Sequence, residues 1–400
     1  MANVSSSNGL EKRPTLRFPG FYEPWRAARL GDLLIELSDY ATQESGFPLL
    51  TSSRQGLFVQ EDYFTDKQAS AETTVFSVLP YGCITYRHMS DDNIFHFNIN
   101  RLVANGLVSK EYPVFTVRKE VLDTDFLVDT LNSSPLFSVF CIQQKKGGTR
   151  TRLYFKTLCS YQMFLPVLHE QQVIALFIRL LDKRIERQME LVETLKKYKR
   201  GLLHGLISKT LRFSHKEKWG RVKLGKVFKE RSERANGDEE LLAVTINAGV
   251  QRRTNLDLKD NSSKDKSNYK RVQKGDIAYN TMRMWQGASG ASMYDGIVSP
   301  AYTVITPQAP DHVNIQFWAY YFKYAPLVQT FQKYSQGLTS DTWNLKFPQF
   351  SEIFVSNPPL EEQNEIATML QAIDQRITSE EGRLSSICQM KSSLYAQLFI

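Results

Sequence analysis

A long heptad pattern that occurs twice constrains the fold of this chain more than any other feature. Two rows of mainly hydrophobic residues, each with members seven apart, run through residues 166–210, and the same rows return in 358–400. Such rows form the seam of a coiled coil. No proline interrupts the heptads, and about 40 residues at a rise of 1.5 Å predict a helix of about 60 Å in each copy. The predicted seam residues are Ile174, Ile178, Leu181, Ile185, Val192, Leu195, Leu202, Ile366, Leu370, Ile373, Ile377, Leu384, Ile387 and Leu394.

The two helical copies correspond position by position, polar interruptions included. Gln188 corresponds to Glu380, and Lys199 corresponds to Lys391. A lysine beside the seam can direct its ammonium group to solvent, so we interpret Lys199 and Lys391 as structural. The second copy gives the first a partner helix within the same chain. If the helices pack antiparallel, a pseudo-two-fold axis relates the copies and the pair acts as a spacer.

The segments that precede the helices repeat as well. Trp25 corresponds to Trp219, and Tyr86 corresponds to Tyr279, with short stretches between turn residues that are typical of strands. We therefore predict an α+β (mixed α/β) fold, in which two long antiparallel coiled-coil helices join two similar globular modules. The predicted segments are a flexible N-terminal lead (1–20), a first module (21–165), a first helix (166–210), a connector (211–218), a second module (219–357) and a second helix (358–400).

Composition excludes some classes of protein. There is no apolar run of about 18 residues and no signal-peptide pattern, which predicts a cytoplasmic chain without a membrane segment. The four cysteines lack the spacing of zinc ligands, so we predict no metal site. A net charge of +8, from 50 Lys and Arg against 42 Asp and Glu, permits a polyanionic partner without requiring one.

Catalytic motifs are missing or incomplete. Gly220 to Val227 resembles a phosphate-binding loop but ends in Val227, where a Ser or Thr would hold Mg²⁺. Asn357 to Leu360 resembles an adenine methyltransferase motif without its aromatic residue. The histidines are scattered, with no defensible Ser/His/Asp or Cys/His arrangement. We predict a chain without catalytic residues and without a cofactor of its own.

Between their shared positions the two modules diverge in sequence, which suggests that they recognise different targets. Neutral drift after duplication is the alternative, and it stays open. Base edges and phosphates are bound by Arg, Lys, Asn and Gln, with help from aromatic side chains. For each single residue a solvated surface role is at least as probable as base contact. The candidates for DNA binding are Arg87, His88, Asn93, Lys145, Lys146, Arg150 and Arg152 in the first module, and Asn280, Arg283, Trp285, Gln286, Lys333, Gln336 and Thr339 in the second.

Several short motifs, in duplicated order, resemble the specificity subunits of Type I restriction-modification systems. They are Leu16 to Phe21 followed by Trp25, the Gly-Asp-Ile-x-Tyr element at 275–279, and the Pro-Pro-Leu-Glu-Glu-Gln start of the second helix at 358–363. The resemblance covers essentially the whole chain. The first copy departs from it, because Cys83 stands where the second copy has Asp276.

The resemblance implies a non-catalytic reader of double-stranded DNA. Each module would be a target recognition domain for one half of a split, asymmetric site. The helices would fix the spacing and bind two modification (methyltransferase) subunits, in which S-adenosylmethionine is expected, and restriction subunits would join through the complex. The alternative is a bivalent coiled-coil scaffold whose modules bind protein ligands without DNA specificity.

Overall fold

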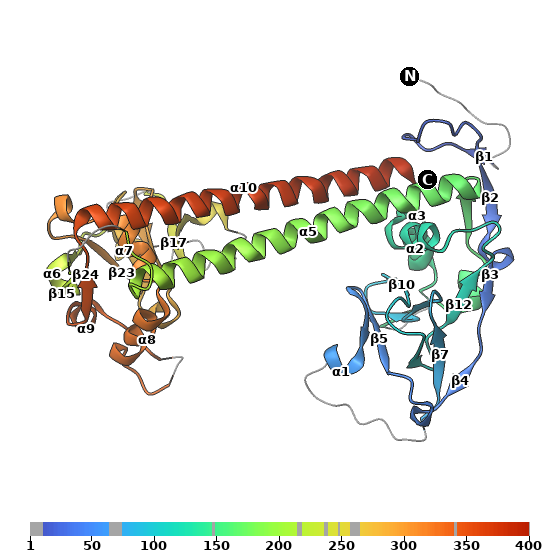
Figure 1. Cartoon of the computed structure of the whole chain (residues 1–400), viewed down its shortest axis with the longest axis horizontal. Helices are drawn as coiled ribbons and strands as arrows, with labels where there is room; N and C mark the ends of the chain where they lie inside the picture. The colour runs from blue at the N-terminus through green and yellow to red at the C-terminus, as the bar shows by residue number, and fades with distance from the viewer. Residues whose placement is uncertain are drawn as a thin grey trace. The chain divides into compact units, whose positions relative to one another are not determined.

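The structure is a computed structural model that describes residues 11–63, 74–145, 149–213, 218–235, 239–246, 249–256, 265–339 and 342–399. The chain divides into two compact units. Unit 1 comprises Met1–Gln188 and Arg383–Ile400, and unit 2 comprises Met189–Gly382. We call the part of unit 1 before the first long helix the first module, and the part of unit 2 between the long helices the second module (Figure 1).

Short antiparallel strands form the sheets of the first module. The four-stranded sheet has the order β10 (Phe97–Ile99), β8 (Ile84–Tyr86), β12 (Val114–Val117), β3 (Leu34–Glu36). The three-stranded sheets are β1 (Glu11–Lys12), β2 (Trp25–Arg29), β14 (Gln162–Leu165) and β11 (Asn105–Ser109), β7 (Phe76–Pro80), β4 (Tyr40–Ala41). The two-stranded pairs are β5 (Leu50–Ser53) with β6 (Gly56–Val59) and β9 (Met89–Ser90) with β13 (Thr151–Arg152).

The second module repeats much of this arrangement. Its four-stranded sheet has the order β21 (Ser289–Ala291), β20 (Ile277–Asn280), β23 (Tyr302–Pro307), β16 (Phe228–Glu230). The remaining pairs are β15 (Gly220–Lys223) with β24 (Phe354–Asn357), β17 (Leu242–Thr245) with β18 (Gly249–Arg252), and β19 (Lys270–Val272) with β22 (Gly296–Val298). In both modules the buried tyrosine of the central strand, Tyr86 or Tyr279, faces the first residue of the edge strand.

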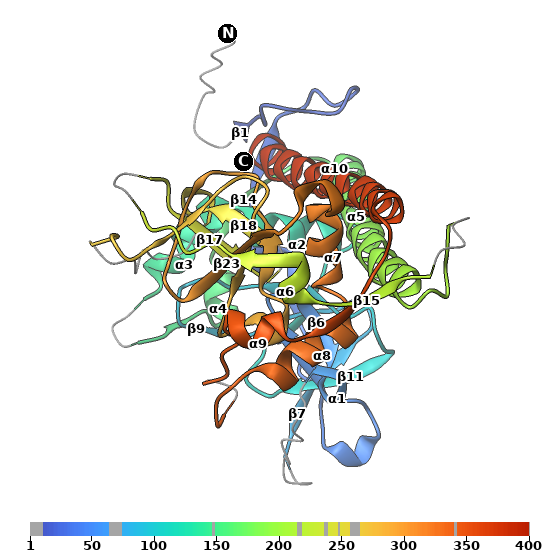
Figure 2. The same cartoon turned by 90° about the vertical axis from the view of Figure 1, so that its left-hand side faces the viewer.

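Three short helices and one long helix follow in the same order in both halves of the chain. In unit 1 the helices are α1 (Gln60–Tyr63), α2 (Thr124–Ser133), α3 (Pro135–Gln143) and α4 (Phe155–Leu158), followed by α5 (Leu168–Ile207), which continues into unit 2. In unit 2 the helices are α6 (Leu224–Val227), α7 (Ile315–Tyr321), α8 (Ala325–Tyr334) and α9 (Phe347–Ser351), followed by α10 (Leu360–Leu398), which continues into unit 1. The equivalent series are α2, α3, α4 and α5 in the first half, and α7, α8, α9 and α10 in the second. Figure 2 shows α7 beside α5 and α10 in unit 2.

Each hydrophobic core contains the beginning of one long helix and the end of the other. In unit 1, Ile174 of α5 shares a core with Leu398 of α10. In unit 2, Leu202 of α5 shares a core with Ile366 and Leu370 of α10. The helices are therefore antiparallel within each unit. The predicted fold class is confirmed: a mixed α/β chain with two similar modules and two long antiparallel helices.

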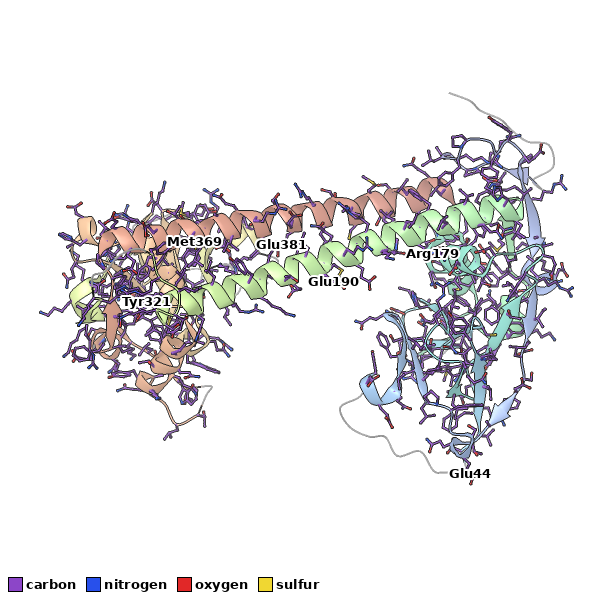
Figure 3. The ribbon with its side chains drawn as sticks, in the orientation of Figure 1. Glu44, Arg179, Glu190, Tyr321, Met369 and Glu381 are labelled. Carbon is purple, nitrogen blue, oxygen red and sulfur yellow. The ribbon has the colours of Figure 1, made fainter. Side chains whose placement is uncertain are left out.

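The predicted seam lies on the inner faces of these helices. Every one of its fourteen residues is buried or half-buried. In contrast, Arg179 and Glu190 of α5 and Met369 and Glu381 of α10, which lie off the two heptad rows, are exposed (Figure 3).

The repeated Lys and Asp residues of the helices form ion pairs. In unit 2, Lys199 Nζ lies 2.6 and 2.7 Å from the two carboxylate oxygens of Asp374, and Tyr320 of α7 donates to the same carboxylate at 2.7 Å. In unit 1, Lys391 pairs with Asp182. The heptad rows therefore tolerate a lysine because an aspartate of the opposite helix neutralises its charge.

Candidate nucleic-acid interface

In the first module, strand pairing brings the two candidate loops together. Strand β9 follows Arg87 and His88, and it pairs with β13 so that Ser90 faces Thr151. Arg150 Nε lies 2.7 Å from Asp91 Oδ1, and the Thr151 hydroxyl donates to the side chain of Asn93. Two segments about 60 residues apart in sequence therefore form one continuous surface.

The lysine and arginine candidates of this surface that the structure describes are exposed. Arg87, Lys145, Arg150 and Arg152 face solvent, whereas Lys146 lies outside the described residues. Exposed guanidinium groups can contact phosphates or bind a guanine edge in bidentate fashion.

His88 lies beneath this surface. Its side chain is 6% exposed, its ring stacks on Tyr154 at 5.6 Å, and its Nδ1 has no hydrogen-bond partner. Burial lowers the pKa of His88, so the imidazole is neutral at physiological pH. In this conformation His88 supports the surface from within and does not present a donor to DNA.

Arg54 joins this surface although it lies outside the loops that the sequence singled out. It sits in the turn between β5 and β6 and forms an ion pair with Asp92 at 2.5 Å. Hydrogen bonds from Arg54 and Ser90 lower the pKa of Asp92 to about 2, so this carboxylate is charged. The only sequence signal was a basic residue in a short turn between two strand-like segments.

In the second module, the two candidate loops meet through a pair of tryptophans. Trp285, in the 3₁₀ helix η5 (Met284–Gln286), packs edge-to-face on Trp343 at 5.2 Å. The backbone N–H of Leu345 donates to Thr281 at 2.9 Å, and Gln336 pairs with Asn344. Trp343 belongs to the second loop and was not predicted, because nothing in the local sequence marks it as a partner of Trp285.

The candidate side chains here differ in exposure. Arg283, Lys333, Gln336 and Thr339 are exposed. Asn280, Trp285 and Gln286 are half-buried, and the side-chain oxygen of Asn280 accepts from the backbone N–H of Met282 at 3.0 Å. The indole N–H of Trp285 donates to Met282 at 3.0 Å. Arg283 and Lys333 supply positive charge, while the two tryptophans fix the shape of the surface.

An open pocket of about 260 Å³ lies next to these loops. Met282 and Asn344 line it together with the ion pair between Glu230 and Lys270, whose atoms are 3.2 Å apart. The buried side-chain oxygen of Asn344 has no hydrogen-bond partner.

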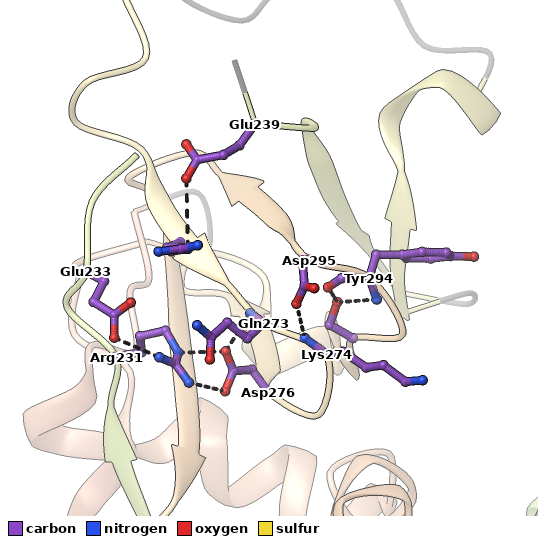
Figure 4. A network of polar contacts seen from close by, with 10 residues as sticks. Arg231, Glu233, Glu239, Gln273, Lys274, Asp276, Tyr294 and Asp295 are labelled. Carbon is purple, nitrogen blue, oxygen red and sulfur yellow. Dashed lines mark hydrogen bonds and ion pairs between the residues drawn. The ribbon is translucent and has the colours of Figure 1, made fainter. Parts of the chain in front are cut away.

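The turn before β20 carries Asp276, where the first copy has Cys83, and Figure 4 shows the polar contacts that surround this carboxylate. Arg231 binds Asp276 through two hydrogen bonds of 2.7 and 3.1 Å, and the N–H of Gln273 donates to the same carboxylate at 2.8 Å. Asp276 is 2% exposed, so its charge is compensated within the fold.

The first copy replaces Asp276 and both partners of its carboxylate. Leu37 corresponds to Arg231, because each donates its backbone N–H to the equivalent valine of the adjacent strand. Cys83 replaces Asp276 and is buried in an apolar cluster that Leu37 contacts. Pro80 replaces Gln273 and has no N–H that would need an acceptor. In the first copy, Leu37, Cys83 and Pro80 therefore replace the ion pair and its hydrogen bond with apolar contacts.

Within the ranges that the structure describes, no group of His, Cys, Asp and Glu side chains is arranged to hold a metal ion. The same ranges contain no helix that combines the length and the apolar character needed to span a bilayer.

The fold and these surfaces define a class of protein with two similar modules, each carrying paired variable loops, and two shared helices. Residues 216–389 match the family described as the Type I restriction modification DNA specificity domain. This segment is similar to that family, and the predicted resemblance of the chain to Type I specificity subunits is confirmed.

Solved structures of low sequence identity share the fold over nearly the whole chain. The S subunit of a Type I restriction-modification system from M. genitalium is 15% identical, with a TM-score of 0.56, covering 97% of this chain and 99% of that one. The HsdS subunit from Thermoanaerobacter tengcongensis is 15% identical, with a TM-score of 0.51 and coverages of 96% and 97%. A chain from a structure concerned with complex assembly and conformational transition of the type I R-M system is 13% identical, with a TM-score of 0.55 and coverages of 96% and 99%.

Proposed function

We propose that this chain reads DNA sequence as the specificity subunit of a Type I restriction-modification complex, with each module reading one half of a split, asymmetric target. One observation carries the proposal. In each module, two variable loops that are distant in sequence converge on one surface, through β9 and β13 in the first and through Trp285 and Trp343 in the second. Exposed arginines on both surfaces supply groups that bind phosphates and guanine edges.

In this proposal the chain itself performs no catalysis. The long helices set the spacing between the half-sites, and their exposed faces bind two modification subunits. Those subunits supply S-adenosylmethionine and methylate adenine, and restriction subunits join through the complex. The complex acts in the cytoplasm on double-stranded DNA. Two observations support this role of the chain. Residues 216–389 match the specificity family, and each long helix has one end in unit 1 and the other in unit 2.

The test maps methylated sites in DNA that has been exposed to the chain reconstituted with its modification subunits. We expect a target with two unlike halves and an unread spacer. Replacing residues 87–93 should change one half, and replacing residues 280–286 should change the other. If either replacement changes both halves, the proposal of one module for each half is wrong.

A second measurement separates this proposal from a scaffold that binds only protein ligands. Neutralisation of phosphates by Lys and Arg releases counterions, so DNA affinity should fall steeply as salt is raised. DNA binding without sequence preference, or no DNA binding by the reconstituted complex, would favour the protein-binding alternative.

A further inference from the structure

Helices α2 and α7 occupy equivalent places in the two modules. Asp123 caps α2 by accepting from Phe126, and Asn314 caps α7 by accepting from Phe317. Both phenylalanines are fully buried. Counting nine residues on from each cap gives Asn132 in the first module and Lys323 in the second. Position, rather than chemistry, is what these two side chains share.

Asn132 ties the edge strand of its sheet to α2. Its side-chain oxygen accepts from the backbone N–H of Phe97 at 2.9 Å, and its amide nitrogen donates to the Phe97 carbonyl at 3.0 Å. Phe97 is the first residue of β10, the strand that follows the candidate loop at 87–93. Asn132 therefore fixes the point at which this loop returns to the sheet.

Lys323 makes the corresponding connection in the second module. Its Nζ donates to the carbonyl of Gly287 and, at 2.8 Å, to that of Ile246. Gly287 directly follows the turn that carries Trp285 and lies two residues before β21, the counterpart of β10. Its φ of +79° is a conformation that glycine adopts readily. The Lys323 ammonium group thus links Gly287, at the end of the candidate loop, to Ile246, the residue that follows β17.

The environment of Lys323 disfavours its charged form, because the side chain is partly buried and lies near another positive charge. Within the described residues both of its hydrogen-bond partners are carbonyls, not carboxylates. The charge of Lys199 of α5 acts on Lys323. Lys199 itself pairs with Asp374 of α10, which also accepts a hydrogen bond from Tyr320 of α7. Burial, with a smaller contribution from the charge of Lys199, lowers the pKa of Lys323 to about 8.

We propose that Lys323 is a positioning residue that holds the recognition loop of the second module, as Asn132 does in the first. This inference rests on the proposed function. Charged donors form hydrogen bonds about twice as strong as neutral ones. Loss of a proton from Nζ therefore weakens the hold on Gly287, whereas the neutral amide of Asn132 has no proton to lose in this range. Recognition of one half-site should depend on pH, and recognition of the other should not.

The experiment uses the full chain, reconstituted with its modification subunits, in three forms: unaltered, Lys323→Met and Lys323→Arg. A randomised duplex pool first defines the target. Affinity is then measured at pH 7 and pH 9.5 for the selected duplex and for duplexes with either half scrambled. We expect discrimination of the second half to fall about tenfold at pH 9.5 in the unaltered chain, and at both pH values in Lys323→Met. Lys323→Arg keeps its charge at pH 9.5 and should lose the pH dependence.

Asn132→Leu provides the matched control, because it should weaken discrimination of the first half equally at both pH values. Hydrogen exchange of amides 285–289, measured without DNA, should be faster in Lys323→Met than in the unaltered chain. If the reconstituted complex of the unaltered chain selects no sequence, the proposed function fails, and hydrogen exchange of amides 285–289 alone then tests the role of Lys323. The inference is overturned if exchange at 285–289 is unchanged, or if both halves are read but Lys323→Met keeps the second half and its pH profile.

Discussion

The side-chain oxygen of Gln171 accepts a hydrogen bond of 2.9 Å from the backbone N–H of Asp123, the residue that caps α2. Gln363 accepts from Asn314, the cap of α7, at the same distance. Each glutamine also donates at 3.0 Å to the carbonyl of the proline five residues earlier. The first turn of each long helix is thereby fastened to the helix of its own module.

Replacement of these glutamines should destabilise the unit that contains them. Gln171→Leu or Gln363→Leu leaves buried backbone groups without partners, at a cost of about 1–3 kcal/mol for each group. The measurement is urea unfolding of the full chain, with Gln172→Leu and Gln371→Leu as exposed controls on the same helices. A loss no larger than that of the controls would show that these bonds contribute little.

Replacement of Asp276 alone should destabilise the second module, whereas combined replacement of Asp276, Arg231 and Gln273 should restore most of the lost stability. Asp276→Cys removes one partner of a buried ion pair, for which a loss of about 3–5 kcal/mol is expected. Adding Arg231→Leu and Gln273→Pro reproduces the first copy, so the triple variant should recover most of that stability. Unfolding by urea gives the comparison. A triple variant less stable than Asp276→Cys would show that the apolar substitute depends on further residues of the first module.

The stability of unit 1 should fall as pH rises from about 4 to about 7. Burial raises the pKa of Asp129 to about 7, with additional effects from Asp125 and Asp182 that outweigh Lys391. The folded state therefore binds a proton that the unfolded state releases near pH 4, and this contribution is lost between about pH 4 and pH 7. A change of about 1–3 kcal/mol is expected across that range.

Asp129→Asn should flatten this profile and make unit 1 more stable than the unaltered chain at pH 8. Hydrogen exchange in α2 during urea titrations at pH 5 and pH 8 provides the measurement. The exposed Asp39→Asn serves as the control, since its profile should follow that of the unaltered chain. Parallel profiles for the unaltered chain and Asp129→Asn would contradict the prediction.

Insertion of one heptad into α5, with its counterpart in α10, should lengthen the unread spacer of the target. Seven residues add about 10 Å at 1.5 Å each, which corresponds to roughly 3 base pairs at 3.4 Å each. Mapping of methylated sites reads the spacer directly. An unchanged spacer would show that the helices do not set the distance between half-sites.

The heptad rows and the duplicated anchors predicted the helices and the repeated modules because both signals are carried along the sequence. Leu202 and Ile366, for example, follow from spacing alone, and both are buried. The ion pair between Lys199 and Asp374 could not be predicted, because the register of two antiparallel helices depends on packing at both ends.

The candidate surfaces were only partly predictable for a similar reason. Arg87 and Arg283 were identified as polar residues in divergent loops, and the structure leaves both exposed. The burial of His88 and the contact of Trp343 with Trp285 arise from tertiary pairing, which leaves no local pattern. Which of these residues contact DNA, and where the domain boundaries fall, stay predictions.

The exchange of helix ends between the units has a consequence for biosynthesis. Leu398 and Phe399 belong to the core of unit 1, yet a ribosome reaches them only after every residue of unit 2 has been made. The core of the first module therefore stays incomplete, with part of its apolar surface exposed, while the second module is translated. At roughly 5–20 residues per second this interval lasts on the order of 10 to 40 seconds, long enough for a chaperone to bind the exposed apolar surface.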